Sequence, residues 1–163
     1  GKGLIPVAKA IELLYLAGAA KRAGVIRPYL DHPDANIRAN AALAVAIDPD
    51  SRPTVVRLLK DRGQPREVRL SALSGLSSAD TAFPSYSLEI IKDKNEDREV
   101  RKAAINRLIG FINYHEINKE FLIEFTKVLK TIALKERVGP GSLGDLSKRV
   151  LSYMQRSSPS VPK

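Results

Sequence analysis

The sequence predicts an all-α fold built from stacked pairs of helices. Residues 59–61 (Leu-Lys-Asp) and 66–69 (Arg-Glu-Val-Arg) align without a gap with residues 91–93 (Ile-Lys-Asp) and 98–101 (Arg-Glu-Val-Arg). The apolar residues of each copy recur in steps of three and four, which is the spacing of a helix face. Ala and Leu supply most of the apolar share, and both favour closely packed helices. We therefore expect a helical content above about 60% and no sheet.

A further copy of this pattern lies upstream, with Tyr-Leu-Asp at residues 29–31. The apolar residue that opens each second helix recurs at nearly equal intervals, at Ile37, Val68 and Val100. One helix pair cannot bury its apolar face alone, so stacked copies share a continuous core. The expected repeats cover residues 25–47, 53–77 and 84–112.

Each expected repeat contains a short first helix, a turn and a second helix. Pro53 and Pro84, one repeat length apart, precede the first helices, and proline suits a first helical position because its missing N–H costs nothing there. The inward positions of the second helices are small, as at Ala72, Gly75 and Ala104. Small residues at these positions predict a close approach of neighbouring helices.

The N-terminal region predicts one more helix, over residues 4–20, as a half-repeat or cap. Val7, Ile11, Leu14 and Gly18 repeat the second-helix spacing. Further apolar residues around its circumference indicate a helix covered on both sides, namely Ile5, Ala10, Leu13 and Leu16.

The C-terminal region predicts a longer helix pair over residues 116–155, followed by a disordered tail over residues 157–163 that is rich in Ser and Pro. The helical repeats as a whole are expected to form one domain over residues 1–156. Because the chain begins Gly1-Lys2-Gly3 without a methionine, we expect a processed or excised fragment of a longer protein.

The order of an aspartate, a turn and then Val-Arg-x-x-Ala resembles the HEAT repeat, and more narrowly the HEAT-like repeats also seen in phycobilisome lyases. The resemblance covers about residues 25–112. It implies a right-handed α-α superhelix, a HEAT-like solenoid of about four to five helix pairs. It also implies a structural role for the arginine that follows the first apolar residue of each second helix. These arginines are Arg38, Arg69 and Arg101, one in each copy.

In this family the arginine pairs with an aspartate of the inter-helix turn and ties the repeats together. By resemblance, Asp34 and Asp97 are the expected partners, since each lies one helical turn before its arginine. The middle copy departs from the pattern, because Pro65 stands at that position and leaves Asp61 as the candidate substitute.

Composition and charge limit the function classes. The chain has no cysteine, which excludes disulfides and thiolate metal sites and leaves the compartment open. The net charge of +9 is uneven. Residues 1–30 carry five basic residues and one acidic, residues 31–126 carry fourteen basic and fifteen acidic, and residues 127–163 carry eight basic and two acidic. The basic excess therefore lies at the ends of the chain.

The sequence predicts no catalytic, cofactor or metal site. His32 and His115 lie far apart in the chain and form no metal-ligand spacing, and His32 is interpreted as a turn residue. Gly139, Gly141 and Gly144 have a dinucleotide-like spacing, but they follow an expected helix rather than a strand. An acidic cluster is interpreted as the solvated N-terminus of a helix: Glu96, Asp97 and Glu99.

The function expected from these observations is non-catalytic binding of a protein partner through the concave face of the solenoid, which the second helices line. Cofactors are not expected. The candidate contacts are the outward polar residues of those helices: Asn40, Ser71, Ser74, Lys102 and Asn106.

Two other functions remain open. The first is a nucleic-acid-binding solenoid that uses the basic C-terminal helices, although the chain lacks the Trp usual in HEAT-like DNA glycosylases. The second, implied by the resemblance alone, is a bilin lyase-like subunit. The candidate polyanion contacts are Lys127, Lys130, Lys148 and Arg149.

Overall fold

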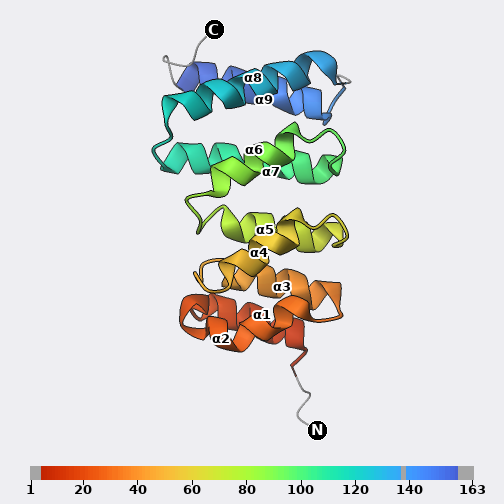
Figure 1. Cartoon of the computed structure of the whole chain (residues 1–163), viewed down its shortest axis with the longest axis vertical. Helices are drawn as coiled ribbons and strands as arrows, with labels where there is room; N and C mark the ends of the chain where they lie inside the picture. The colour runs from red at the N-terminus through yellow and green to blue at the C-terminus, as the bar shows by residue number, and fades with distance from the viewer. Residues whose placement is uncertain (1–4, 137–138, 158–163) are drawn as a thin grey trace. The chain divides into compact units, whose positions relative to one another are not determined.

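The computed structural model describes residues 5–136 and 139–157, and in these ranges it is all-helical, with 74% helix and no strand. The all-α prediction is confirmed. The expected tail falls outside the described residues, apart from Ser157, which ends the last helix. The chain divides into two compact units, residues 1–83 and residues 84–163, and Figure 1 labels the helices of each.

Unit 1 contains three longer helices packed in series, α1 against α3 and α3 against α5, with α4 against α5. The first helix of its first repeat is divided into a short α-helix and a 3-10 helix, and Pro28 lies at the start of the 3-10 segment. The elements are α1 (Val7–Leu16), η1 (Ala19–Arg22), α2 (Ala23–Ile26), η2 (Arg27–Asp31), α3 (Ala35–Val45), α4 (Arg52–Lys60) and α5 (Arg66–Leu76).

Unit 2 contains the last repeat and a longer C-terminal pair. Helices α8 and α9 pack against each other, and α9 also packs against α7. The elements are α6 (Phe83–Lys92), whose first residue closes unit 1, α7 (Arg98–Tyr114), α8 (Lys119–Lys135) and α9 (Leu143–Ser157).

Helix α1 is shorter than the helix predicted over residues 4–20. It ends at Leu16 because Gly18 adopts a left-handed backbone conformation with a φ of 99°, which stops an α-helix. Ile11 is buried, at 2% exposure, whereas Leu16 is 72% exposed. One face of α1 is therefore packed, and the second apolar face is open to solvent in the described part of the chain.

The core of each unit is built from the predicted inward positions of the second helices. Ala41 and Ala72 are buried in unit 1, and Val100, Ala104 and Leu108 are buried in unit 2. Among the described residues, the helices are too short or too polar for any of them to traverse a lipid bilayer.

Candidate functional site

Two of the repeat arginines make the same backbone contact. The Arg69 Nε donates to the Leu59 carbonyl oxygen at 2.8 Å, and the Arg101 Nε donates to the Ile91 carbonyl oxygen at 3.1 Å. Each carbonyl lies near the end of the first helix of the same repeat, where backbone acceptors lack helical partners. Both arginines are buried, at 4% and 5% exposure. Each one therefore fastens the end of its first helix to its second helix.

Arg38 links its own turn to the next one. Its Nη1 donates to the carbonyl oxygens of His32 and Pro33, at 2.7 and 2.8 Å, and its Nε donates to the Gln64 Oε1 at 3.2 Å. The Gln64 amide in turn donates to the Asp61 Oδ2 at 3.0 Å. This bond, with the Gly63 N–H as a smaller cause, lowers the pKa of the Asp61 carboxyl.

The aspartates that the resemblance pairs with arginines act as helix caps. The Asp34 carboxylate accepts from the Asn36 N–H at 2.8 Å, and the Asp97 carboxylate accepts from the N–H groups of Glu99 and Val100. Side-chain oxygens satisfy unpaired N–H groups at a helix start, so these aspartates fix the ends of α3 and α7. The implied pairs of Arg38 with Asp34 and of Arg101 with Asp97 are therefore replaced by the contacts described above.

The two histidines take structural positions. The His32 Nδ1 accepts from the Asp34 N–H at 3.0 Å, as a turn residue does. The His115 ring stacks on the Phe111 ring, with 4.1 Å between the ring centroids. Within residues 5–136 and 139–157, no group of three or more His, Asp or Glu side chains is arranged to hold a metal ion.

The predicted partner contacts of unit 1 lie on α3 and α5, which pack side by side. Asn40, Ser71 and Ser74 are half-buried, and the Asn40 amide donates to the Asn36 carbonyl oxygen of its own helix at 3.0 Å. The neighbouring helices leave these short polar side chains partly accessible.

The remaining two predicted contacts lie on α7 in unit 2. Asn106 is exposed, whereas Lys102 is half-buried and forms an ion pair with Glu99 one turn earlier, at 3.2 Å. The structure gives Lys102 a local partner and leaves Asn106 open to solvent.

The predicted polyanion contacts lie on two helices. Lys127 and Lys130 belong to α8, where Lys127 is exposed and Lys130 is half-buried. Lys148 and Arg149 are exposed on α9, and the Arg149 Nε lies 3.3 Å from the Asp145 carboxylate of the same helix. Arg149 is thus partly neutralised.

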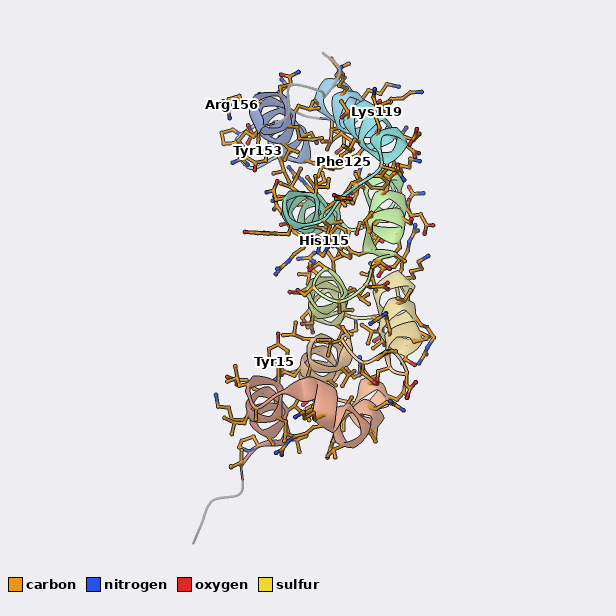
Figure 2. All side chains as sticks on the ribbon, turned by 90° about the vertical axis from the view of Figure 1, so that its left-hand side faces the viewer. Tyr15, His115, Lys119, Phe125, Tyr153 and Arg156 are labelled. Carbon is orange, nitrogen blue, oxygen red and sulfur yellow. The ribbon has the colours of Figure 1, made fainter. Side chains whose placement is uncertain are left out.

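The C-terminal ends of α7 and α9 form an exposed surface with tyrosines, which we call the aromatic end. It comprises Asn113, Tyr114, Tyr153 and Arg156. Tyr114 is 87% exposed, and the Tyr153 hydroxyl donates to the Asn113 Oδ1 at 3.2 Å, which joins the two helices. Tyr153 and Arg156 both belong to α9, where Figure 2 labels them.

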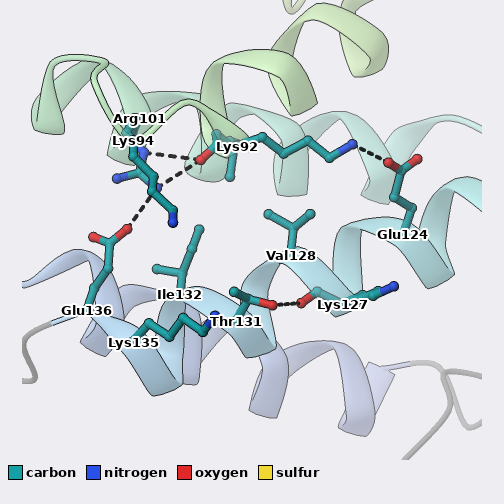
Figure 3. A pocket seen from close by; sticks show the side chains of 11 residues that line it. Lys92, Lys94, Arg101, Glu124, Lys127, Val128, Thr131, Ile132, Lys135 and Glu136 are labelled. Atoms are coloured by element: carbon teal, nitrogen blue, oxygen red, sulfur yellow. Dashed lines mark hydrogen bonds and ion pairs between the residues drawn. The ribbon is translucent and has the colours of Figure 1, made fainter.

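A groove of about 610 Å³ lies in unit 2 between α8 and the region where α6 turns into α7. We call it the basic groove. Its apolar part is formed by Ile91, Val128 and Ile132. Figure 3 shows Val128 and Ile132 rising from α8 toward the segment that carries Lys92, Lys94 and Arg101.

Ion pairs occupy two positions along the basic groove. The Lys92 ammonium pairs with the Glu124 carboxylate, and the Arg101 Nη2 lies 2.8 Å from the Glu136 carboxylate. The same Nη2 donates to the Ile91 carbonyl oxygen at 2.9 Å. Both carboxylates of the groove are therefore neutralised by cations of the groove.

Three more lysines line the basic groove, and within the described residues none of them has a carboxylate partner: Lys94, Lys127 and Lys135.

Sequence reasoning found Lys127 but missed the basic groove and Tyr114. The groove combines residues from α6, the following turn, α7 and α8, and no local pattern marks that combination. Tyr114 follows an apolar run and shows no signal of exposure in the sequence.

Comparisons of the chain with models of protein families, with curated proteins and with solved structures find no match.

Proposed function

We propose that this chain is a non-catalytic macromolecular interaction module, which binds a protein partner through the surface of its second helices. The aromatic end of α7 and α9 carries this proposal. Tyr and Arg are enriched among residues that dominate protein interfaces, because they contribute large contact areas and hydrogen bonds. Tyr114 is almost fully exposed, and the bond from Tyr153 to Asn113 holds the neighbouring surface in place.

We further propose that the repeats form a HEAT-like, right-handed α-α superhelix. The support comes from the nearly constant spacing of Ile37, Val68 and Val100, and from the contact that Arg69 and Arg101 share with the end of the preceding helix. The close packing of α3 against α5 in unit 1 is the packing that such repeats require.

Site-specific photo-crosslinking tests the proposed binding surface. Benzoylphenylalanine replaces Tyr114 in one variant and Leu134 in a control, because Leu134 on α8 is equally exposed, at 85% against 87%. Each variant is irradiated in extract from the cells that produce the protein, and adducts are analysed by mass spectrometry and by nuclease treatment.

We expect a protein adduct of defined mass from the Tyr114 position and none from the Leu134 position. Adducts from Leu134 alone, or from neither position, refute binding through the second helices. A nuclease-sensitive adduct at Tyr114 refutes the protein partner in favour of nucleic acid.

One observation favours nucleic-acid binding as the second candidate. Lys148, Arg149 and Arg156 lie exposed on α9, the helix that also carries Tyr153. Cations combined with an aromatic ring are the elements of a single-strand binding surface. Because Arg149 already has Asp145 as a partner, this surface offers fewer free cations than the sequence indicates.

A further inference from the structure

We propose that the basic groove of unit 2 binds an extended acidic segment of a partner protein, one in which apolar side chains are flanked by aspartate or glutamate. This inference rests on the proposed function as a protein-binding module. It adds a second contact surface and names the chemistry of the segment that the groove recognises.

The apolar part of the groove fits aliphatic side chains of a partner. Ile91 and Ile132 are buried by their own packing, and Val128 is half-buried, so the floor is held in place before a ligand arrives. A volume of about 610 Å³ lies within the usual range of ligand sites, roughly 300–1,000 Å³. It accommodates short aliphatic side chains such as those of leucine or isoleucine.

The charges of the groove select an acidic segment. The carboxylates of Glu124 and Glu136 are already paired, whereas Lys94, Lys127 and Lys135 have no carboxylate partner in the part of the chain that the structure describes. The groove therefore presents three uncompensated positive charges around an apolar floor. Complementary charge favours an acidic partner and excludes basic ones.

The buried arginine gives the groove a fixed wall. The Nε and Nη2 atoms of Arg101 bond to the Ile91 carbonyl, and Nη2 also pairs with Glu136. Because these contacts already hold the guanidinium in place, binding costs little ordering of this side chain, and such preorganisation favours affinity.

Nucleic acid fits this groove less well than an acidic peptide. Single-stranded nucleic acids bind by stacking their bases on aromatic rings beside a basic track. Among the residues that the structure describes, those that line the groove include no aromatic side chain. Its aliphatic floor contacts an aliphatic side chain more favourably than it contacts a sugar–phosphate backbone.

A fluorescence-anisotropy titration of the full chain tests the inference. The probe is a labelled synthetic peptide in which two leucines are flanked on both sides by aspartates and glutamates. A second peptide has serine in place of both leucines, a third has lysine in place of every acidic residue, and a short single-stranded DNA is the fourth probe. The titration is run at roughly 50 mM salt, where surface charges are only partly screened.

Two triple variants with the same net charge locate the binding site, because each removes three positive charges. The groove variant carries Lys94→Ala, Lys127→Ala and Lys135→Ala. The control variant changes three exposed basic residues of unit 2 outside the groove and outside the aromatic end, with Arg98→Ala, Arg107→Ala and Lys119→Ala. Circular dichroism verifies that both variants retain their helical content.

We expect the acidic leucine peptide to bind about tenfold more weakly to the groove variant than to the unchanged chain, since three cation–carboxylate contacts are lost. The control variant, which keeps the groove, should bind it nearly as well as the unchanged chain. The serine and lysine peptides should bind at least about tenfold more weakly than the leucine peptide.

Three results would overturn the inference. If the control variant loses binding and the groove variant keeps it, the peptide binds unit 2 outside the basic groove, which refutes the inference. Tighter binding of the DNA than of the peptide also refutes it. If no peptide binds the unchanged chain, the groove is not an acidic-peptide site, whereas crosslinking at Tyr114 still decides the proposed function.

Discussion

Gly75 of α5 lies directly against Ala46 at the end of α3. A Cβ atom placed on Gly75 would stand 2.7 Å from the Ala46 Cβ and 3.0 Å from the Leu43 carbonyl oxygen. Real Cβ atoms essentially never come as close as the first of these distances, and the second is tighter than most Cβ contacts. The two helices can therefore approach this closely because residue 75 has no side chain. The contact fixes the distance between the second helices of two successive repeats in unit 1.

Gly75→Ala should therefore destabilise unit 1. Alanine at a helical position ordinarily adds about 0.5–1 kcal/mol of stability relative to glycine. Here the forced separation of two packed helices outweighs that gain, and we expect a net loss of about 1–3 kcal/mol in the free energy of unfolding. Urea denaturation followed by circular dichroism measures it.

Gly110 in α7 is the matched control. A Cβ atom there meets nothing within 4 Å, so Gly110→Ala should stabilise the protein by about 0.5–1 kcal/mol through helix propensity alone. If the two substitutions shift the unfolding free energy in the same direction, the close approach at Gly75 does not limit the packing.

The sequence was sufficient to predict this packing but not the end of α1. Gly75 and Ala72 fall at inward positions of a repeated pattern, and such a pattern constrains neighbouring helices directly. Gly18 also falls on the helical spacing that includes Ile11 and Leu14, yet its φ of 99° ends the helix instead. Glycine permits a close contact between helices, and it also permits the left-handed conformation that ends a helix. The spacing of apolar residues alone does not distinguish these two roles.

Ala72→Arg and Ala104→Arg should each destabilise strongly, by about 4 kcal/mol or more, because each introduces a charge into a fully buried position. Ser74→Arg, at a half-buried position of the same helix as Ala72, should cost no more than about 0.5 kcal/mol. Thermal melting of the three variants compares them. Equal losses at all three positions would show that the assigned faces of the second helices are wrong.

Arg101→Met should cost about 3 kcal/mol, because it leaves the Ile91 carbonyl without its donor and the Glu136 carboxylate without its cation. Arg107→Met on the exposed side of the same helix should stay within about 0.5 kcal/mol. Denaturant midpoints measure the difference. If both variants lose the same free energy of unfolding, the hydrogen bonds and the ion pair of the Arg101 guanidinium do not contribute to stability.

The repeat arginines and the basic groove differ in how far the sequence predicts them. Arg69 and Arg101 stand at the same position of aligned copies, so a shared structural role follows from the repeat alone. Their carbonyl acceptors could not be predicted, because every residue carries a carbonyl. Lys94 and Lys135 are far apart in the sequence, and only the packing of α8 near the end of α6 brings them to one groove.

Asp48 should make the stability of unit 1 depend on pH. The Ser51 hydroxyl, which donates to this carboxylate, and then the Arg27 guanidinium, at 2.7 Å, lower the pKa of Asp48 in the folded state. A lowered folded-state pKa gives stability that is present above the unfolded value, about 3.9, and is lost as the pH falls through the folded value.

Ser51→Ala removes the largest cause of that shift. It should lower the free energy of unfolding at about pH 7, and its effect should shrink toward about pH 2–3, where Asp48 becomes protonated. Urea titrations across this range test the dependence. A loss that is equally large at both ends of the range would mean that the Ser51 hydroxyl stabilises unit 1 independently of the Asp48 charge.

Duplex DNA should bind this chain only weakly. Each neutralised phosphate releases a counterion and contributes about −0.9 to the slope of log affinity against log salt, so four contacts through the predicted residues would give a slope of about −3.6. The variant that tests them carries Lys127→Ala, Lys130→Ala, Lys148→Ala and Arg149→Ala. The control changes four basic residues of unit 1: Lys21→Ala, Arg22→Ala, Arg62→Ala and Arg66→Ala.

We expect no micromolar binding of a short duplex at roughly 150 mM salt, as measured by fluorescence anisotropy. The four predicted residues lie on two helices, Lys130 is half-buried, and Arg149 is already beside Asp145, so they do not supply four free cations. Residues 31–126 carry no excess of positive charge, so they do not extend the basic surface beyond the C-terminal helices. Micromolar or tighter binding that is abolished in the C-terminal variant and retained in the unit 1 control would replace the protein-binding proposal with the nucleic-acid one.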